Sequence, residues 1–193
     1  MTTRSLMSRR GFLSALAVGV PLLGAVPSAL ASASFSAPDP NVLTNAGTRA
    51  LRFSHTHTGE HLTVEYFSGG SYLPDALSNV NHFLRDFRTG DIHDIDPGLL
   101  DLLYHLHDQT ESSRPFQVIS GYRSPKTNTM LRQHSEGVAA GSLHMQGQAI
   151  DIRLADIPLS QLRRAALASR RGGVGFYPAS DFVHVDTGRV RSW

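Results

Sequence analysis

Two histidines and one aspartate in the C-terminal third of the chain have the types and spacing of a metal site. The stretch SLHMQGQAID places His144 seven residues before Asp151, with the small residues Gly147 and Ala149 between them. His184 follows in FVHVDTG, which alternates as a β-strand does. If this strand pairs with the one that begins at IDIRL, the three side chains converge. Two imidazoles and one carboxylate are typical of catalytic zinc sites, which keep a fourth position open for water.

The other histidines among the ten in the chain give weaker evidence for a metal. His55 and His57 lie two residues apart on one expected strand and therefore share a face. The sequence favours an exposed face of a hairpin for this pair, because no further ligand has an evident way to join it. His105 and His107 lie on a leucine-rich helix without sharing a face, which predicts packing at the edge of the core.

The elements that must position these residues are short and alternate along the chain. Alternation on both sides of HTGE predicts a β-hairpin over 50–67. Apolar spacing and helix-start signals predict helices over 73–88, 96–110, 124–135 and 158–171. Strands are expected over 115–122, 148–154, 172–178 and 181–188. This pattern predicts an α+β domain, built as a small antiparallel sheet with flanking helices.

The N-terminal residues have the composition of an export signal. SRRGFLSALAVGVPLLGAVPSALASA has a basic start, an apolar middle and small residues near its end. The adjacent Arg9 and Arg10 are typical of the twin-arginine type. A membrane anchor is the alternative, and two prolines within a short apolar run disfavour it. We therefore expect a signal peptide over 1–33, a linker over 34–48, one domain over 49–193, and a periplasmic location.

Composition excludes several classes of protein. The 193-residue chain has no cysteine, so disulfides, thiolate metal ligands and a cysteine nucleophile are excluded. Removing residues 1–33, which carry three arginines and no acid, leaves 15 of the 18 basic residues beside 16 acidic ones. A net charge near −1 gives no support for nucleic-acid binding, which usually needs a basic patch. We expect a monomer that is not inserted in the membrane once the signal is removed.

Three motifs, SGYRS, SLHMQGQAID and GGVGFYPASDFVHVDTG, resemble the M15-type zinc peptidases of peptidoglycan metabolism. The nearest likeness is to the DUF882 branch of twin-arginine-exported murein endopeptidases. The broader group includes D-Ala-D-Ala dipeptidases and the zinc domain of hedgehog proteins, and the resemblance implies their fold. It also implies that His144, Asp151 and His184 bind one zinc ion. Arg123 of GYRS would contact the substrate or the developing oxyanion.

The resemblance leaves two candidates for the general base. Asp181 stands three residues before His184, where many relatives carry an acid, and the sequence favours it. Asp186 follows His184 by two residues on the same strand face and is the rival. Ser142 is expected to orient the loop or bind substrate, and Tyr122 to bind substrate or pack behind the site.

The implied activity is zinc-dependent hydrolysis of amide bonds in peptidoglycan stem peptides or their cross-links. Zinc lowers the pKa of bound water toward about 7, the aspartate accepts a proton, and Arg123 offsets charge on the carbonyl oxygen. A D,D cross-link, an L,D cross-link and a dipeptide bond all remain candidates. The alternative function is a non-catalytic zinc module that binds cell-wall peptides. A structural zinc domain is less favoured, because three ligands leave the site open.

Overall fold

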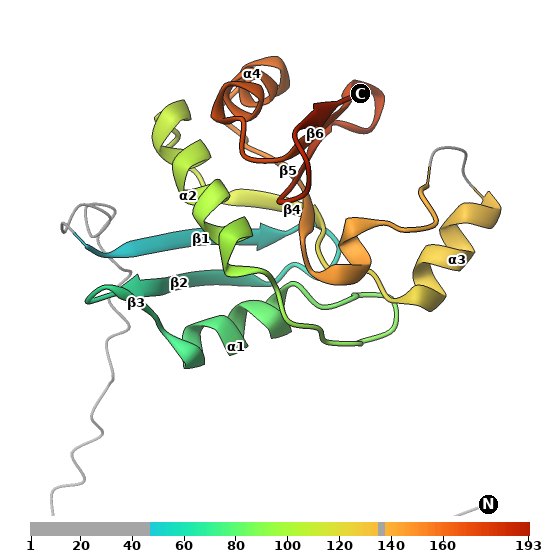
Figure 1. Cartoon of the computed structure of the whole chain (residues 1–193), viewed down its shortest axis with the longest axis horizontal. Coiled ribbons are helices and arrows are strands. Elements are labelled where there is room, and N and C mark those ends of the chain that lie inside the picture. The colour runs from blue at the N-terminus through green and yellow to red at the C-terminus, as the bar shows by residue number, and fades with distance from the viewer. Residues whose placement is uncertain (1–46, 135–137) are drawn as a thin grey trace, which may run out of the picture. The chain divides into compact units, whose positions relative to one another are not determined.

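The computed structural model describes residues 47–134 and 138–193 (Figure 1). The expected signal peptide over 1–33, and all but the last two residues of the expected linker, lie outside the described residues. Within those described ranges, no helix has the length and apolar character needed to cross a membrane.

The described chain is built on one sheet of eight strands in the order β3-β2-β1-β4-β5-β7-β6-β8. The strands are β1 (Arg49–His55), β2 (His61–Ser68), β3 (Ser71–Tyr72), β4 (Phe116–Ser120), β5 (Ala149–Arg153), β6 (Gly173–Tyr177), β7 (Phe182–Asp186) and β8 (Arg191–Ser192). The helices are α1 (Pro74–Phe83), α2 (Pro97–Thr110), α3 (Pro125–His134) and α4 (Leu159–Ser169), with short 3-10 turns η2 (Leu143–Gln146) and η3 (Pro178–Ser180).

The α+β class is confirmed, and the sheet differs in one respect from the expected small antiparallel one. It is mixed, because β1 pairs with β4 and β6 pairs with β8 in parallel. The other five pairings are antiparallel. Parallel neighbours need a crossover connection, and α1 and α2 lie in the chain between β1 and β4.

Helix α2 begins where the sequence predicts it, and its leucines build much of the core. The Asp96 side chain accepts a hydrogen bond from the backbone N–H of Gly98 at 2.8 Å, and Pro97 occupies the first turn. The leucines of α2 at 99, 100, 103 and 106 are fully buried. They share one apolar core with Phe53 of β1 and Phe116 of β4.

The two faces of the C-terminal strands have different roles. Ile150 and Ile152 of β5 and Val183 and Val185 of β7 belong to the core that also contains Leu162 of α4. Because side chains alternate along a strand, the residues between them point to the opposite face. That face carries Asp151 and Ala149 of β5 and His184 and Asp186 of β7, which are paired as Asp151 with His184 and Ala149 with Asp186.

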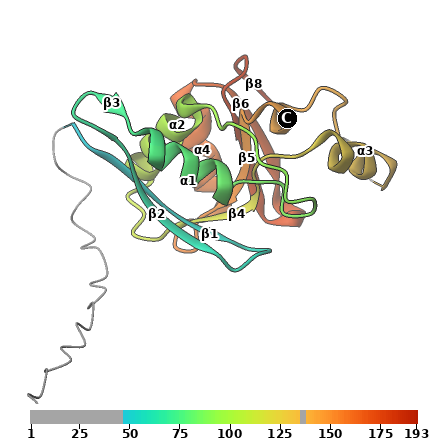
Figure 2. The same ribbon diagram turned by 90° about the horizontal axis from the view of Figure 1, so that it is seen from below.

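Helix α3 lies at the margin of the domain in both views (Figures 1 and 2). The side-chain amide of Asn128 in α3 donates to the backbone carbonyl of Ala139 at 3.2 Å. This bond ties the helix to the segment that leads into η2. One end of the domain is therefore formed by α3 and the residues that precede His144.

The β1–β2 hairpin is confirmed, but the exposed position expected for His55 is wrong. Only 1% of His55 is exposed, and its ring lies 5.9 Å from that of Phe83 and 5.4 Å from that of Phe87. Burial lowers the pKa of His55 to about 4. His57 is exposed and stacks on Phe87 at 4.3 Å. The two aromatic rings come from α1 and the residues after it, which hairpin periodicity does not reveal.

Candidate metal centre

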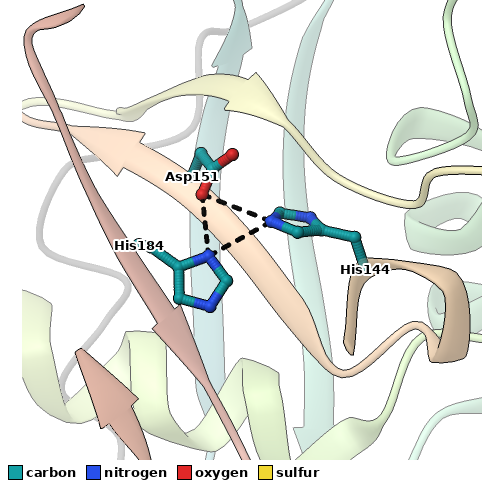
Figure 3. A group of neighbouring side chains, drawn as sticks. All are labelled: His144, Asp151 and His184. Carbon is teal, nitrogen blue, oxygen red and sulfur yellow. Dashed lines mark hydrogen bonds and ion pairs between the residues drawn. The ribbon is translucent and has the colours of Figure 1, made fainter. Parts of the chain in front are cut away.

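His144, Asp151 and His184 are brought together from three elements (Figure 3). His144 lies in η2, Asp151 in β5 and His184 in β7. Nε2 of His144 lies 3.2 Å from Nδ1 of His184 and 3.3 Å from Oδ1 of Asp151. Nδ1 of His184 lies 2.9 Å from the same oxygen. These three side chains, called the metal group below, form the predicted cluster.

The chemistry and spacing of the metal group fit a zinc ion. Ligand atoms about 2.0–2.1 Å from zinc at tetrahedral angles lie about 3.3 Å apart. The three separations in the metal group run from 2.9 to 3.3 Å. Two nitrogens and one carboxylate oxygen leave one tetrahedral position for water or substrate.

Each imidazole in the metal group is oriented through its other nitrogen. Nδ1 of His144 donates to the backbone carbonyl of Gly121 at 2.8 Å, so Nε2 is left as the free lone pair. Nε2 of His184 donates to Oδ2 of Asp186 at 3.0 Å, so Nδ1 carries the lone pair when the ring is neutral. Metal-binding histidines characteristically donate their second ring N–H in this way, which fixes the tautomer and the ring direction.

The turn between His144 and Asp151 requires glycine at position 147. Gly147 has a φ of 66°, which favours glycine. A Cβ atom there would lie 2.0 Å from the backbone carbonyl oxygen of Asp94. The backbone of Gly147 in turn accepts a hydrogen bond from the N–H of Asp96 at 3.0 Å. The small residue noted in the sequence thus allows a close approach between backbones, and the approach fixes where η2 ends.

The metal group is buried and its carboxylate is held ionised. Asp151 is 5% exposed, His144 2% and His184 8%. Burial raises the pKa of Asp151, but the contacts with His144 and His184 outweigh burial and the net pKa is lowered. Burial likewise opposes protonation of His184, yet its hydrogen bonds to Asp151 and Asp186 leave the pKa raised overall. A carboxylate that stays ionised near neutral pH is the form that binds a cation.

Arg123 lies beside the metal group, as the GYRS motif predicts. Its Nη2 atom is 3.8 Å from Oδ2 of Asp151, and 13% of its side chain is exposed. Burial lowers the pKa of Arg123, and Asp151 opposes that shift. Its Nε atom is buried without a hydrogen-bond partner among the described residues. The terminal Nη atoms form no hydrogen bond to a described residue, only the long ion pair with Asp151, and therefore have donor capacity for a substrate oxygen.

The backbone around Arg123 is fixed by a residue that sequence reasoning missed. Asp86 is 1% exposed, and its Oδ2 accepts from the backbone N–H of Ser124 at 2.9 Å and from the Ser124 hydroxyl at 2.7 Å. The backbone N–H of Arg123 donates to the carbonyl of His144 at 3.2 Å. Asp86 thus holds the GYRS segment through its two hydrogen bonds with Ser124. No spacing signal in the sequence links Asp86 to residues 38 positions later.

The two aspartates expected as general bases occupy different surroundings. The Asp181 side chain is 61% exposed and pairs with Nη1 of Arg153 at 2.7 Å. Asp181 has a φ of 54° at the turn before β7, which directs its backbone away from strand geometry. Asp186 is fully buried and bonds to His184, Arg191 and the backbone N–H groups of Gly173 and Gly188.

Ser142 and Tyr122, the other two residues expected to bind substrate, lie in different places. Ser142 lines a cavity that opens next to the metal group and is described below. Tyr122 is 8% exposed and stacks on His93 at a centroid distance of 4.8 Å. It is not among the residues that line that cavity. Tyr122 thus packs against His93, outside the lining of that cavity.

A cavity of about 380 Å³ opens over the metal group. Besides the metal group it is lined by Arg123, Val138, Ala139, Gly141, Ser142, Leu143, Tyr177, Phe182, Arg191 and Trp193. The aromatic residues Tyr177, Phe182 and Trp193, called the aromatic shelf below, were not predicted as site residues. The strand alternation of GGVGFYP and DFVHV was a signal for the first two. Trp193 reaches the site only because β8 pairs with β6.

Comparison with known proteins identifies the family. The family model described as peptidoglycan L,D-endopeptidase MepK matches residues 43–193, which include the metal group, Arg123 and the aromatic shelf. The chain belongs to the MepK family of M15 peptidases. The resemblance noted from the three sequence motifs is therefore confirmed.

Named relatives of the MepK family match nearly the whole chain. Peptidoglycan L,D-endopeptidase MepK of Escherichia coli K12 is 46% identical over 175 residues, covering 91% of this chain and 92% of that protein. A probable MepK of Haemophilus influenzae is 38% identical over 182 residues, covering 94% and 91%. Among solved structures, the L-Ala D-Glu endopeptidase ChiX of Serratia marcescens aligns with 47% of this chain and 68% of its own at 20% identity and a TM-score of 0.31.

Proposed function

We propose that this chain is a zinc-dependent peptidoglycan endopeptidase that cleaves L,D cross-links between stem peptides. The observation that carries the proposal is a buried His-Asp-His group at the floor of an open cavity, in a member of the MepK family. Relatives named as peptidoglycan L,D-endopeptidases support the choice of bond.

The residues around the metal group support hydrolysis of an amide. Zinc held by His144, Asp151 and His184 would supply Lewis acidity and a water of lowered pKa. Arg123 would bind the carbonyl oxygen of the scissile amide through its guanidinium group, because charge develops on that oxygen in the transition state. A buried, water-poor setting strengthens such an interaction.

Asp186 acts on His184 in this proposal and not on the attacking water. Its two oxygens already accept five hydrogen bonds, three at Oδ1 and two at Oδ2. A carboxylate has about four lone-pair sites, so no capacity remains for a further donor. Asp181 supports the turn before β7 through its pairing with Arg153. We therefore assign neither aspartate as the general base.

The site of action is outside the cytoplasm, where peptidoglycan lies. We assign the finer location to the periplasm and the export route to the twin-arginine pathway, on the basis of Arg9, Arg10 and the apolar stretch that follows them.

The experiment that tests the function is digestion of purified sacculi with the zinc-loaded mature chain. The expected result is release of muropeptides whose masses identify cleavage at L,D cross-links, with no release by a His184→Ala variant. Binding to sacculi without release, with zinc present at one per chain, would instead establish the non-catalytic cell-wall peptide-binding module. Cleavage at another bond would correct the specificity and leave the enzyme class in place.

A further inference from the structure

Tyr177 and Trp193 form a hydrogen-bonded pair beside the metal group. Nε1 of Trp193 donates to the hydroxyl of Tyr177 at 2.7 Å. The indole ring of Trp193 also lies 5.2 Å from the imidazole of His184. One indole therefore contacts both the Tyr177 hydroxyl and a residue of the metal group.

The pair is held in place by the shape of β6. Gly175 stands opposite His184 in the register of β6 and β7. A Cβ atom on Gly175 would lie 2.8 Å from ring atoms of both Tyr177 and Trp193, so both rings rest on the bare backbone of this strand. Tyr177 also stacks on Phe182 at 4.6 Å. A hydroxyl fixed in this way needs little rearrangement when it meets a substrate.

The hydrogen of the Tyr177 hydroxyl is available to a ligand. An indole N–H can only donate, so the hydroxyl oxygen is the acceptor in the bond with Trp193. Among the described residues, this hydroxyl donates no hydrogen bond. A hydroxyl that accepts one hydrogen bond becomes a stronger donor in the next, because neighbouring bonds polarise one another.

Few other donors in the cavity are free. Arg191 is bound to Asp186 through both terminal nitrogens, and the indole N–H of Trp193 is bound to Tyr177. Arg123 lines the cavity, and its terminal nitrogens form only a long ion pair of 3.8 Å with Asp151. Ser142 also lines the cavity, but no side-chain hydrogen bond among the described residues orients it. Of the described side chains that line the cavity, Arg123 and Tyr177 thus offer oriented donors to a substrate oxygen.

We propose that Tyr177 is a catalytic residue whose hydroxyl donates a hydrogen bond to the scissile carbonyl oxygen as negative charge develops there. Trp193 is its positioning residue, because the indole N–H and the packing over Gly175 set the direction of the hydroxyl. The assignment rests on the proposed endopeptidase function and adds a residue to it. It predicts stabilisation of the transition state, with little effect on binding of the uncleaved peptide.

Removal of the hydroxyl tests the role directly. Tyr177→Phe keeps the ring and its packing, and kcat on an L,D-cross-linked muropeptide should fall about 10²–10³-fold, the usual loss for one donor of this kind. KM and zinc content should stay unchanged. Trp193→Phe should give a smaller fall in kcat, because the donor to Tyr177 is lost. Tyr104→Phe on α2, a tyrosine outside the cavity, is the matched control and should keep wild-type kcat.

A second readout separates transition-state stabilisation from ground-state binding. Trp193 is the only tryptophan of the chain, so its fluorescence reports binding in the aromatic shelf. Titration of the cross-linked muropeptide into zinc-free protein should give the same Kd for wild type and Tyr177→Phe. A phosphinate analogue of the scissile amide, which carries a tetrahedral anionic centre, should bind the zinc-loaded variant about 10²-fold more weakly than wild type, in parallel with kcat.

Three results would overturn the assignment. Unchanged kcat in Tyr177→Phe would remove the hydroxyl from catalysis. A higher KM in Tyr177→Phe, with muropeptide binding weakened to the same extent, would make Tyr177 a binding residue only. A loss of zinc from this variant would make the role of Tyr177 structural. Failure of the zinc-loaded wild type to release muropeptides would instead refute the endopeptidase function, and the role of Tyr177 would fall with it.

Discussion

Asp186 accepts a hydrogen bond from Nε2 of His184 at 3.0 Å, on the side of the ring opposite the Nδ1 atom that faces Asp151. Arg191 donates to both oxygens of the same carboxylate, at 3.0 and 2.7 Å. Burial raises the pKa of Asp186, but these hydrogen bonds outweigh it and the pKa is lowered. Asp186 therefore stays ionised and orients a proposed zinc ligand.

Asparagine substitutions at the two candidate bases should have different effects. Asp186→Asn should weaken zinc binding about 10–100-fold, the usual consequence of losing such an outer partner. Asp181→Asn should keep zinc affinity and hydrolysis rate close to wild type, because the side chain is exposed and paired with Arg153. Competition with a zinc chelator and muropeptide hydrolysis measure the two effects. If Asp181→Asn keeps zinc but loses 10²–10⁴ in rate, Asp181 is the base after all.

Zinc content should follow the metal group. The purified mature chain should bind about one zinc ion, and His144→Ala and His184→Ala should each lose most of it, because two remaining ligands hold zinc poorly. His105→Ala on α2 is a matched control that should keep the metal. Metal analysis after gel filtration gives the ratio. Full zinc in both site variants would place the metal elsewhere.

Arg123→Gln should lower kcat about 10²–10³-fold without loss of zinc, because it removes a charged donor next to the metal group. Arg164→Gln on the exposed side of α4 is the control and should leave the rate unchanged. Steady-state kinetics and metal analysis on the same preparations provide the comparison. Zinc loss in Arg123→Gln would point to a role in holding Asp151, with which Arg123 forms a long ion pair.

The stability of the zinc-free chain should depend on pH through His55. Burial lowers its folded pKa to about 4, whereas the unfolded value is near 6.5. Between these values the unfolded state binds more protons, so the free energy of unfolding should fall as pH decreases from 6.5 to 4, by up to about 3 kcal/mol. Urea unfolding at a series of pH values measures the slope. His55→Leu should flatten it, and an equal slope in both proteins would exclude His55 as the source.

Export should require the paired arginines. Replacing Arg9 and Arg10 with lysine keeps the charge but should leave the precursor in the cytoplasm, as expected for a twin-arginine signal. Fractionation with antibody detection shows the distribution. Periplasmic accumulation equal to wild type would remove the twin-arginine assignment while leaving export itself untouched.

Local patterns predicted most elements and the metal group. The hairpin, the cap of α2 at Asp96 and the convergence of His144, Asp151 and His184 all depend on periodicity or on short motifs. Each of these signals lies within a short stretch of sequence. Because side chains alternate along a strand, such a stretch also shows which residues share a face of the sheet.

Long-range packing was the part that local patterns could not provide. Burial of His55 depends on Phe83 and Phe87, about 30 residues later in the chain. Strand β8 pairs in parallel with β6 and so brings Trp193 to the cavity. It has only two residues, which is too short for an alternating pattern to be visible in the sequence. The resemblance to M15-type peptidases suggested Asp181 as the general base, and no sign of its positive φ or of its pairing with Arg153 was visible in the sequence.

Strand β6 has glycine at positions 173 and 175, and the absence of a side chain at each one leaves space for residues of the site. A Cβ atom on Gly173 would lie 2.5 Å from Oδ2 of Asp186, and one on Gly175 would meet Trp193 and Tyr177. The missing side chain at Gly173 leaves room for Asp186, which orients His184. The missing side chain at Gly175 leaves room for Tyr177 and Trp193 of the aromatic shelf. Alanine at either position would therefore act as a loss-of-function mutation at a residue with no chemistry of its own. A survey that searched only for reactive side chains would overlook both glycines, although one added methyl group at either position would displace residues that line or orient the site.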